Sequence, residues 1–334
     1  MFVLGIETSC DETAAAVIGP EGVLCDVVYT QEIHQRFGGV VPELAGRAHA
    51  EKVVATTRAA LARAGIERPD GVAATAGPGL MGAVLVGLCF GKAAAAGWGV
   101  PFIGVNHLEG HLLSPLLEDP APSYPFLALV VSGGHTTLYV ARGLNDYTVL
   151  GQTVDDAAGE VFDKVARMMG MGYPGGPLID AMARSGDRAA VAFPRIAITP
   201  GSRTRGSRRV RTALDMSFSG LKTAVRTHLQ RSDGWSGPDV AASFQEAVVD
   251  VLCQRVMAAA EQTGITQVAM AGGVAANSRL REAMSALPLE VFMPPRSRCT
   301  DNGAMIANVG RLRLLAGQSD PLDLTARASW TPGQ

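Results

Sequence analysis

A repeated order of predicted elements constrains the fold of this chain more than any other feature. Short apolar runs of β-branched residues, bounded by turn residues, predict one strand meander over 2–30 and another over 126–151. After each meander, stretches of helical spacing alternate with short strands, so that the order β-β-β-α-β-α-β-α occurs twice. Strands that alternate with helices predict largely parallel sheets covered by helices. The sequence therefore predicts two similar α/β domains facing a cleft.

The elements that we expect in the two copies follow the same order, with extra helices in the second. In the first copy we predict strands at 2–8, 13–19, 23–30, 72–76 and 101–105, and helices at 42–64, 79–96 and 107–117. In the second copy we predict strands at 126–132, 136–141, 147–151, 266–271 and 289–293, and helices at 156–169, 177–184, 220–230, 239–263, 275–286 and 302–315. The proline-rich segment 120–125 predicts the crossing between the copies.

The composition agrees with two globular domains. The chain has 334 residues, of which 47% are hydrophobic and 18% charged, and this is enough apolar material for two cores. The formal net charge of −2 gives no general sign of a nucleic-acid partner, so that any RNA contact would depend on a local basic patch. Five scattered cysteines without a CxxC pair indicate a reducing, cytoplasmic compartment.

One apolar stretch raises the alternative of a membrane span. Residues 79–105 carry a single charge, Lys92, but they also contain seven glycines and Pro101, and no basic flank anchors them. We predict a buried helix followed by a buried strand at this place. The N-terminal apolar run has no basic region before it and ends at Glu7, so that we do not expect a signal peptide.

A polar turn follows the first strand of each copy. Residues 7–13 read Glu-Thr-Ser-Cys-Asp-Glu-Thr, and residues 132–136 read Ser-Gly-Gly-His-Thr. Such turns can hold a phosphate, because glycine permits close approach and backbone N–H groups supply positive dipoles, although a single Ser-Gly-Gly hairpin is more often structural. A third segment, 271–277, follows a strand and opens a helix whose N-terminus can hold an anion or a ribose. The sequence has neither a GxGxxG fingerprint nor a P-loop.

His107 and His111 form the strongest candidate pair for binding a metal ion. At positions i and i+4 of a helix they share one face, although a lone pair of this kind is structural about as often. Asp301 lies at the start of the last helix of the second copy, which corresponds to the histidine-bearing helix of the first. Two histidines and one carboxylate would leave coordination positions open for phosphate oxygens or water. Iron(II), zinc and manganese all suit this set.

Other charged residues are weaker candidates. Asp163, Lys164 and Asp180 lie on predicted helices, where a carboxylate is usually solvated. A group of arginines around a Gly/Ser-rich stretch has two interpretations, a solvated loop or a contact with RNA phosphates. Its members are Arg195, Arg203, Arg205, Arg208, Arg209 and Arg211.

Nine motifs occur along the chain in the order of one known family, and together they span nearly its whole length. They are GIETSCDET (5–13), GGVVPE (38–43), TAGPGL (75–80), HLEGH (107–111), VSGGH (131–135), YPGGP (173–177), FSGLK (218–222), AGGV (271–274) and CTDNGA (299–304). With these motifs the chain resembles the TsaD (YgjD, Gcp) family in its bacterial form. It departs from the family pattern between Pro194 and Ser217, where the arginine-rich loop is longer than usual.

The resemblance implies a duplicated actin/Hsp70/sugar-kinase-like (ASKHA) fold around a nucleotide cleft. On this fold we expect a first domain over 1–122, on which a C-terminal segment of about 301–334 packs back, and a second domain over 123–300. The resemblance also implies transfer of the threonylcarbamoyl group from threonylcarbamoyl-AMP to N6 of the adenosine 3′ of the anticodon, in tRNAs reading codons that begin with A. The implied protein partners are a paralogous inactive subunit (TsaB-like) and a small P-loop ATPase (TsaE-like).

The resemblance assigns roles to particular residues. His107, His111 and Asp301 would hold one divalent metal per subunit, with iron(II) favoured. Asp11 and Glu12 would line the reaction centre, where either could be a base for the adenine amine. The adenylate would be bound by a set from the second domain, Val130, Val131, Ser132, Gly133, Gly134, Asp163, Gly176, Asp180 and Asn277.

Three other functions remain open on the sequence. A zinc endopeptidase would place a glutamate beside a histidine, as in HExxH, whereas Glu109 lies two residues from each histidine and points about 200° around the helix from His107. An ATPase or sugar kinase could use the same fold, but such enzymes usually bind magnesium through oxygen ligands. An inactive scaffold paralog would not need the complete set of His107, His111 and Asp301.

Overall fold

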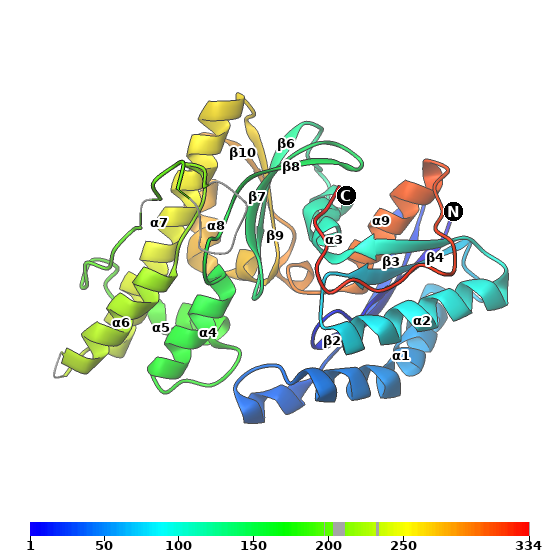
Figure 1. Cartoon of the computed structure of the whole chain (residues 1–334), viewed down its shortest axis with the longest axis horizontal. Helices are drawn as coiled ribbons and strands as arrows, with labels where there is room; N and C mark the ends of the chain where they lie inside the picture. Colours follow the sequence, from blue (N-terminus) through cyan, green and yellow to red (C-terminus); the bar gives the residue numbers. More distant parts are fainter. Residues whose placement is uncertain (197, 203–210, 232–233, 334) are drawn as a thin grey trace. The chain divides into compact units, whose positions relative to one another are not determined.

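The computed structural model describes residues 1–196, 198–202, 211–231 and 234–333. Contacts within the chain divide it into two compact units, Met1–Ala121 together with Asp301–Gln334, and Pro122–Thr300. Each unit contains one five-stranded mixed sheet with helices packed on it (Figure 1). Four members of the arginine group, Arg203, Arg205, Arg208 and Arg209, lie outside the described residues.

The sheet of the first unit has the strand order β3-β2-β1-β4-β5. An antiparallel meander forms one part of it, and two further strands continue the sheet in parallel with the first strand. All residues of β1, β4 and β5 are buried, as expected for strands covered on both faces. The strands are β1 (Val3–Glu7), β2 (Glu12–Gly19), β3 (Gly22–Thr30), β4 (Gly71–Gly77) and β5 (Phe102–Asn106).

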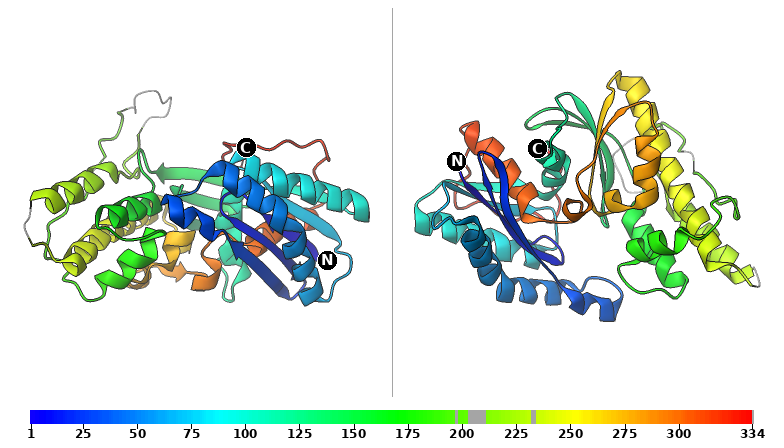
Figure 2. Two further views of the ribbon diagram at one scale, coloured as in Figure 1. Left: turned by 90° about the horizontal axis from the view of Figure 1, so that it is seen from below. Right: turned by 180° about the vertical axis from the view of Figure 1, so that it is seen from behind.

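Helices cover both faces of this sheet. Helices α1 (Pro42–Ala64) and α2 (Met81–Trp98) lie on one face, and α9 (Gly303–Leu315) lies on the other (Figure 2). Helix α9 approaches the sheet closely, because a Cβ added to Gly5 would lie 2.4 Å from the backbone nitrogen of Ala307. Three shorter helices complete the unit, α3 (His107–Leu113) and the 3-10 helices η1 (Glu32–Phe37) and η2 (Ser114–Leu117).

Helix α2 contains the apolar stretch for which a membrane span was one alternative. Among the described residues it is the one helix that is long and apolar enough to pass such a test, with a mean hydropathy of 1.4. Its buried residues pack in the first unit, where the helix contacts β4 and α1. Its single charged residue, Lys92, donates to the carbonyl of Leu324 at 3.0 Å. The strand that follows is buried as predicted, but the helix is only partly buried, with 33% of its residues inside the fold.

The second unit repeats the topology of the first. Its strand order, β10-β9-β6-β7-β8, has the same meander at one side and the same pair of parallel strands at the other. The strands are β6 (Phe126–Val131), β7 (Thr136–Gly143), β8 (Asp146–Gln152), β9 (Gln267–Ala271) and β10 (Glu290–Phe292). The helices are α4 (Ala158–Met168), α5 (Gly175–Ala183), α6 (Ser219–Arg231), α7 (Gly237–Thr263), α8 (Ser278–Ser285), and the 3-10 helices η3 (Gly273–Ala276) and η4 (Arg296–Arg298). The duplication predicted from element order is confirmed.

The main differences between the predicted and the observed elements concern two helices and the short 3-10 helices. The helix expected over 107–117 ends as α3 at Leu113 and continues as η2, in which Pro115 cannot donate a helical hydrogen bond. The helix expected over 275–286 begins as η3, and Asn277 caps α8 instead of lying inside it. The short helix η1 has no counterpart among the predicted elements, because 3-10 turns leave little periodic pattern.

Candidate metal and adenylate sites

Helix α3 presents both candidate histidines of the first unit. It begins directly at the end of β5, where the side-chain oxygen of Asn106 accepts from two backbone N–H groups of the first helical turn, at 2.9 and 3.3 Å. The amide nitrogen of Asn106 donates to the carbonyl of Trp330 at 3.2 Å, so the C-terminal segment also contacts this cap. The cap fixes the start of the helix, and His107 and His111 then lie on one face of it.

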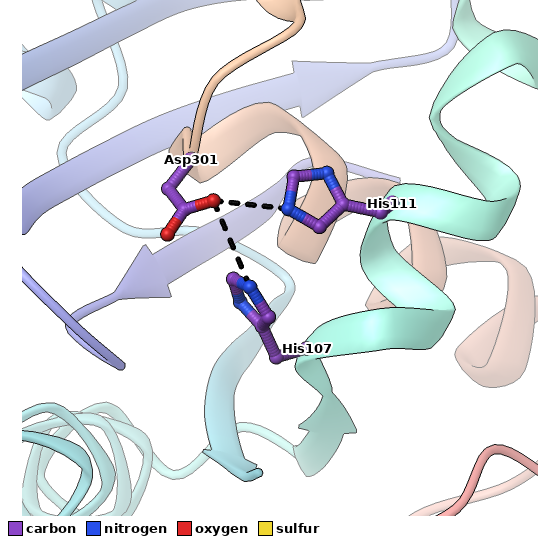
Figure 3. Close-up of side chains that lie close together, drawn as sticks. All are labelled: His107, His111 and Asp301. Atoms are coloured by element: carbon purple, nitrogen blue, oxygen red, sulfur yellow. Dashed lines mark hydrogen bonds and ion pairs between the residues drawn. The ribbon is translucent and has the colours of Figure 1, made fainter. Parts of the chain in front are cut away.

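The two imidazoles and the carboxylate of Asp301 face one another (Figure 3). Oδ1 of Asp301 lies 2.9 Å from Nε2 of His111 and 3.6 Å from Nε2 of His107, and the candidate donor atoms all lie within 4.8 Å of one another. Two donors that each lie about 2.1 Å from one ion are roughly 3–4 Å apart. The three donors therefore converge on one position and could hold a single metal ion once the widest pair draws closer together. By element order Asp301 belongs to the second copy, but its contacts place it in the first unit with the histidines.

A buried carboxylate contacts His107 on the side of the ring opposite to Asp301 and orients it. Oε2 of Glu7 lies 3.0 Å from Nδ1 of His107, and the hydroxyl of Ser9 lies 3.1 Å from the same nitrogen. Glu7 is fully buried, and it also accepts from the hydroxyl of Thr75 at 2.6 Å and from the backbone N–H of Ser9. A carboxylate on Nδ1 favours the tautomer whose Nε2 is free to bind a metal. Sequence reasoning missed this role, although a glutamate at the end of a fully apolar strand was a signal for it.

The charges in the site favour a cation at this position. Burial lowers the pKa of His107, but the carboxylates of Asp301 and Glu7 outweigh burial and raise it to about 9. Burial raises the pKa of Glu7, and the opposing charge of His107 leaves it below its ordinary value. A divalent ion would supply the positive charge that the imidazolium otherwise provides. The donor set thus fits a metal ion in chemistry as well as in spacing.

Asp11 and Glu12 lie beside this group, at the end of the turn between β1 and β2 and at the first residue of β2. Burial, together with the carboxylates of Asp301 and Asp11, raises the pKa of Glu12 to about 10. Glu12 therefore carries a proton at neutral pH while no metal ion is bound. The structure brings the two predicted reaction-centre residues and the predicted metal ligands into one electrostatic group.

Glu109 takes no part in that group. Its fully buried carboxylate lies 2.8 Å from Nη2 of Arg313 on α9. This agrees with the predicted orientation away from the metal face, and it leaves an endopeptidase without the glutamate that would activate water.

The second unit contains the residues predicted to bind the adenylate. Val130 and Val131 end β6, and the backbone N–H of Ser132 donates to the carbonyl of His135 at 2.8 Å across the turn that follows. A Cβ added to either glycine of this turn, Gly133 or Gly134, would meet no atom within 4 Å. The turn therefore has open space in front of its glycines.

The other predicted adenylate residues hold the ends of helices. Oδ1 of Asp163 accepts from the backbone N–H of Gly175 at 2.7 Å, at the start of α5. Oδ1 of Asp180 accepts from the hydroxyl of Ser278 at 2.6 Å, next to Asn277. The amide nitrogen of Asn277 donates to the side-chain oxygen of Gln245 at 2.7 Å, and the amide oxygen of Asn277 caps α8. At Gly176 an added Cβ would meet no atom within 4 Å.

Two members of the arginine group are described, Arg195 and Arg211. Nη2 of Arg195 lies 2.6 Å from Oδ2 of Asp250, and Nε of Arg195 donates to the same oxygen at 2.9 Å. This guanidinium thus binds a carboxylate of its own unit. Contact with an RNA phosphate would have to compete with that ion pair.

Comparison with solved structures establishes the fold. The chain is similar to full-length HypF, with a TM-score of 0.62 and 14% identity over 92% of this chain and 54% of HypF. It is also similar to component A of (R)-2-hydroxyglutaryl-CoA dehydratase from Acidaminococcus fermentans, with a TM-score of 0.52 and 15% identity over 92% of this chain and 96% of that protein. The predicted ASKHA-type fold is confirmed by these neighbours.

Comparison of the sequence identifies the family. The family model described as TsaD, tRNA N6-adenosine threonylcarbamoyltransferase, matches residues 22–308. A protein of that name from Anaeromyxobacter dehalogenans is 51% identical, and the match covers 98% of each chain. Another from Magnetococcus marinus is 50% identical over 94% of this chain and 92% of its own. With most of its length matched and half of its residues identical to those of such relatives, the chain belongs to the TsaD family of tRNA N6-adenosine threonylcarbamoyltransferases.

Proposed function

We propose that the chain is a cytoplasmic acyltransferase that moves the threonylcarbamoyl group from threonylcarbamoyl-AMP to N6 of the adenosine 3′ of the anticodon, in tRNAs that read codons beginning with A. The bond formed joins the carbamoyl carbon to N6, the bond broken joins this carbon to a phosphate oxygen, and AMP and a proton leave. Family membership supports the reaction. The observation that carries the assignment to a site is the metal-donor group of His107, His111 and Asp301 beside Asp11 and Glu12.

His107, His111 and Asp301 would hold one divalent metal, and we favour iron(II) over zinc and manganese. When bound, such an ion supplies positive charge that stabilises phosphate oxygens and the leaving AMP. The chain's own contribution is to keep the donors in place: Glu7 holds the tautomer and orientation of His107, and Asn106 fixes the start of the helix that carries both histidines.

Asp11 and Glu12 would line the reaction centre. An exocyclic adenine amine is a poor nucleophile, so that its position relative to the carbamoyl carbon must provide much of the rate. Glu12 carries a proton in the metal-free protein and can donate a hydrogen bond. We propose that one of these two carboxyl groups, Asp11 or Glu12, accepts the amine proton when the metal ion is bound.

The adenylate would bind to the second unit. Gly133, Gly134 and Gly176 leave room for this ligand, because a Cβ on any of them would meet no atom within 4 Å. Backbone N–H groups of the turn after β6 would face the phosphate. Asp163, Asp180 and Asn277 would position the helices α5 and α8 around the nucleoside. The partners we expect are tRNA, a TsaB-like subunit and a TsaE-like ATPase, without a membrane.

Reconstitution tests this function directly. The purified chain is mixed with its two protein partners, unmodified tRNA, threonine, bicarbonate, ATP and the enzyme that forms the adenylate, and digested tRNA is examined by mass spectrometry. We expect threonylcarbamoyladenosine with the natural chain and at least 100-fold less with His111→Ala, since one lost ligand weakens metal binding and the charge it supplies. Absence of the nucleoside where another TsaD protein succeeds would refute the proposal. Phosphorylation of a sugar without any tRNA product would favour the kinase alternative.

A further inference from the structure

A buried histidine outside the metal-donor group contacts the turn that carries Asp11 and Glu12. His49 lies on α1 and is fully buried. Its Nε2 lies 2.9 Å from the carbonyl oxygen of Cys10, and its Nδ1 lies 2.8 Å from the hydroxyl of Thr13. The two nitrogens of one ring thus contact the residues on both sides of the Asp11–Glu12 pair.

The contacts determine the protonation of this ring. A carbonyl oxygen can only accept, so Nε2 of His49 carries the proton and donates to Cys10. In a neutral ring Nδ1 then has a lone pair, which accepts from the hydroxyl of Thr13. Burial lowers the pKa of His49, so that the neutral form required by both contacts is present at neutral pH.

A third contact to the same turn comes from Gln31, directly after β3. The backbone N–H of Gln31 donates to the carbonyl of Asp11 at 3.1 Å, so that two consecutive carbonyls of the turn are bonded. The side chain of Gln31 is buried and accepts from Nε2 of His34 at 2.9 Å. Nδ1 of His34 accepts from the backbone N–H of Val41 at 3.3 Å. Gln31 is therefore itself fixed by the segment that leads into α1.

A buried histidine is most often only a core residue whose polar atoms are satisfied. His49 differs because both ring nitrogens bond to one short turn on another element, and that turn carries the two candidate reaction-centre carboxyl groups. We propose that His49 is a positioning residue, which fixes the turn from Cys10 to Thr13 so that Asp11 and Glu12 keep their place beside Asp301. The inference rests on the proposed function, since it requires these carboxyl groups to act in the transfer.

The test compares variants that keep the volume of the side chain but remove its bonds. His49→Leu removes the bonds to Thr13 and Cys10 together with the contacts of the Gln31 amide nitrogen, at 3.4 and 3.3 Å from Nδ1 and Nε2. His49→Gln retains an amide that can donate to Cys10. Displacing catalytic groups by about 1 Å costs roughly 100-fold in rate. We therefore expect kcat of His49→Leu to be about 100-fold below that of the natural chain. Its KM for threonylcarbamoyl-AMP should stay within about twofold, and its metal content should be unchanged. The kcat of His49→Gln should be about tenfold higher than that of His49→Leu.

Two further variants separate positioning from packing. Thr13→Val removes the hydroxyl partner with little change in shape, and it should lower kcat less than His49→Leu. Because both act on one contact, the double variant should be no slower than His49→Leu alone. The control is Thr57→Val on the same helix, because the hydroxyl of Thr57 is buried and bonds to no group in the structure, so kcat should stay unchanged. If His49→Leu does not fold, the kcat values of Thr13→Val and His49→Gln still test the positioning role of His49.

The proposal is overturned if His49→Leu folds and keeps its kcat, if only KM changes, or if Thr57→Val loses as much activity. Asp11→Asn and Glu12→Gln are measured beside these variants. If both keep full activity, the reaction-centre assignment fails whatever His49 does. If they lose activity while the His49 and Thr13 variants do not, the assignment stands and the positioning role fails.

Discussion

At the scale of single residues, the site depends on which atom of an imidazole faces which partner. Glu7 contacts Nδ1 of His107, and Asp301 lies on the side of Nε2. Each carboxylate also raises the pKa of that ring, so that a proton and a metal ion compete for the same nitrogen. Two predictions follow from this competition.

The first prediction concerns the negative charge of Glu7, which contacts Nδ1 of His107. Glu7→Gln keeps an oxygen that can accept from Nδ1 but removes the negative charge, and loss of such an outer partner usually weakens metal binding by about 10–100-fold. Calorimetric titration of metal-free protein with manganese or zinc measures this. Thr75→Val, which removes only the hydroxyl bond to Glu7, is the control and should have the smaller effect. Equal affinity of Glu7→Gln and the natural chain would show that Glu7 does not support the metal.

The second concerns the pH dependence of the metal-free protein. The pKa of His107 is about 9 in the folded chain against 6.5 as its ordinary value, so the folded state binds this proton more tightly than the unfolded state does. The resulting stability is complete below pH 6.5 and is lost as pH rises through about 9. The raised pKa of Glu12, about 10, acts in the same direction. We expect Tm to fall from pH 6.5 to 9, and to fall less in His107→Ala. A Tm that rises over this range would contradict the assignment.

At the scale of secondary-structure elements, the metal donors depend on how α3 and α9 are held. Helix α3 is short, and its start is fixed by the Asn106 cap, which the carbonyl of Trp330 contacts in turn. Helix α9 lies close to the sheet because glycines such as Gly5 and Gly310 leave room for it. An ion pair between the buried Glu109 and the partly exposed Arg313 joins the two helices. The positions of the donors thus depend on caps and close packing as well as on the contacts of His107 with Glu7 and Ser9.

The cap of α3 gives a prediction at this scale. Asn106→Ala removes the acceptor of two helical N–H groups and should lower stability by about 1–2 kcal/mol. Asn106→Asp keeps this acceptor and loses the donor to Trp330, so that its effect on stability should be smaller. Chemical denaturation and metal titration of both variants measure the two effects. Metal binding that is equal in Asn106→Ala and the natural chain would show that α3 holds its histidines without the cap.

At the scale of the whole molecule, the two units repeat one topology but carry different chemistry. The first has the metal donors and the candidate reaction-centre carboxyl groups, and the second has open glycine turns and no comparable donor group among its described residues. The repeated fold thus supplies the same strand-end turns twice, and the side chains in them determine the role of each unit.

This division predicts the behaviour of glycine variants in the second unit. Gly176→Ala adds a Cβ that meets no atom of the protein, so we expect unchanged Tm and metal content but at least tenfold weaker binding of an AMP analogue, because the methyl group would occupy ligand space. Gly143→Ala, which also faces open space, is the matched control at the end of β7 and should bind normally. Equal binding by both variants would remove Gly176 from the adenylate site.

The sequence by itself determined the duplicated element order, the helical face shared by His107 and His111, and the family. All three depend on patterns that can be read along the chain, as periodicity, as spacing or as motif. The orientation of Glu109 away from the metal face also followed from helical spacing alone.

Tertiary structure decided which distant residues meet. Asp301 and His111 are 190 positions apart in the sequence, and Glu7 and His107 are 100 positions apart. Each pair comes into contact because α9 and β1 pack in the same unit as α3. Contacts of His49 with the turn before β2 likewise depend on how α1 lies on the sheet. Local spacing contains no information about such contacts, since the packing of buried faces creates them.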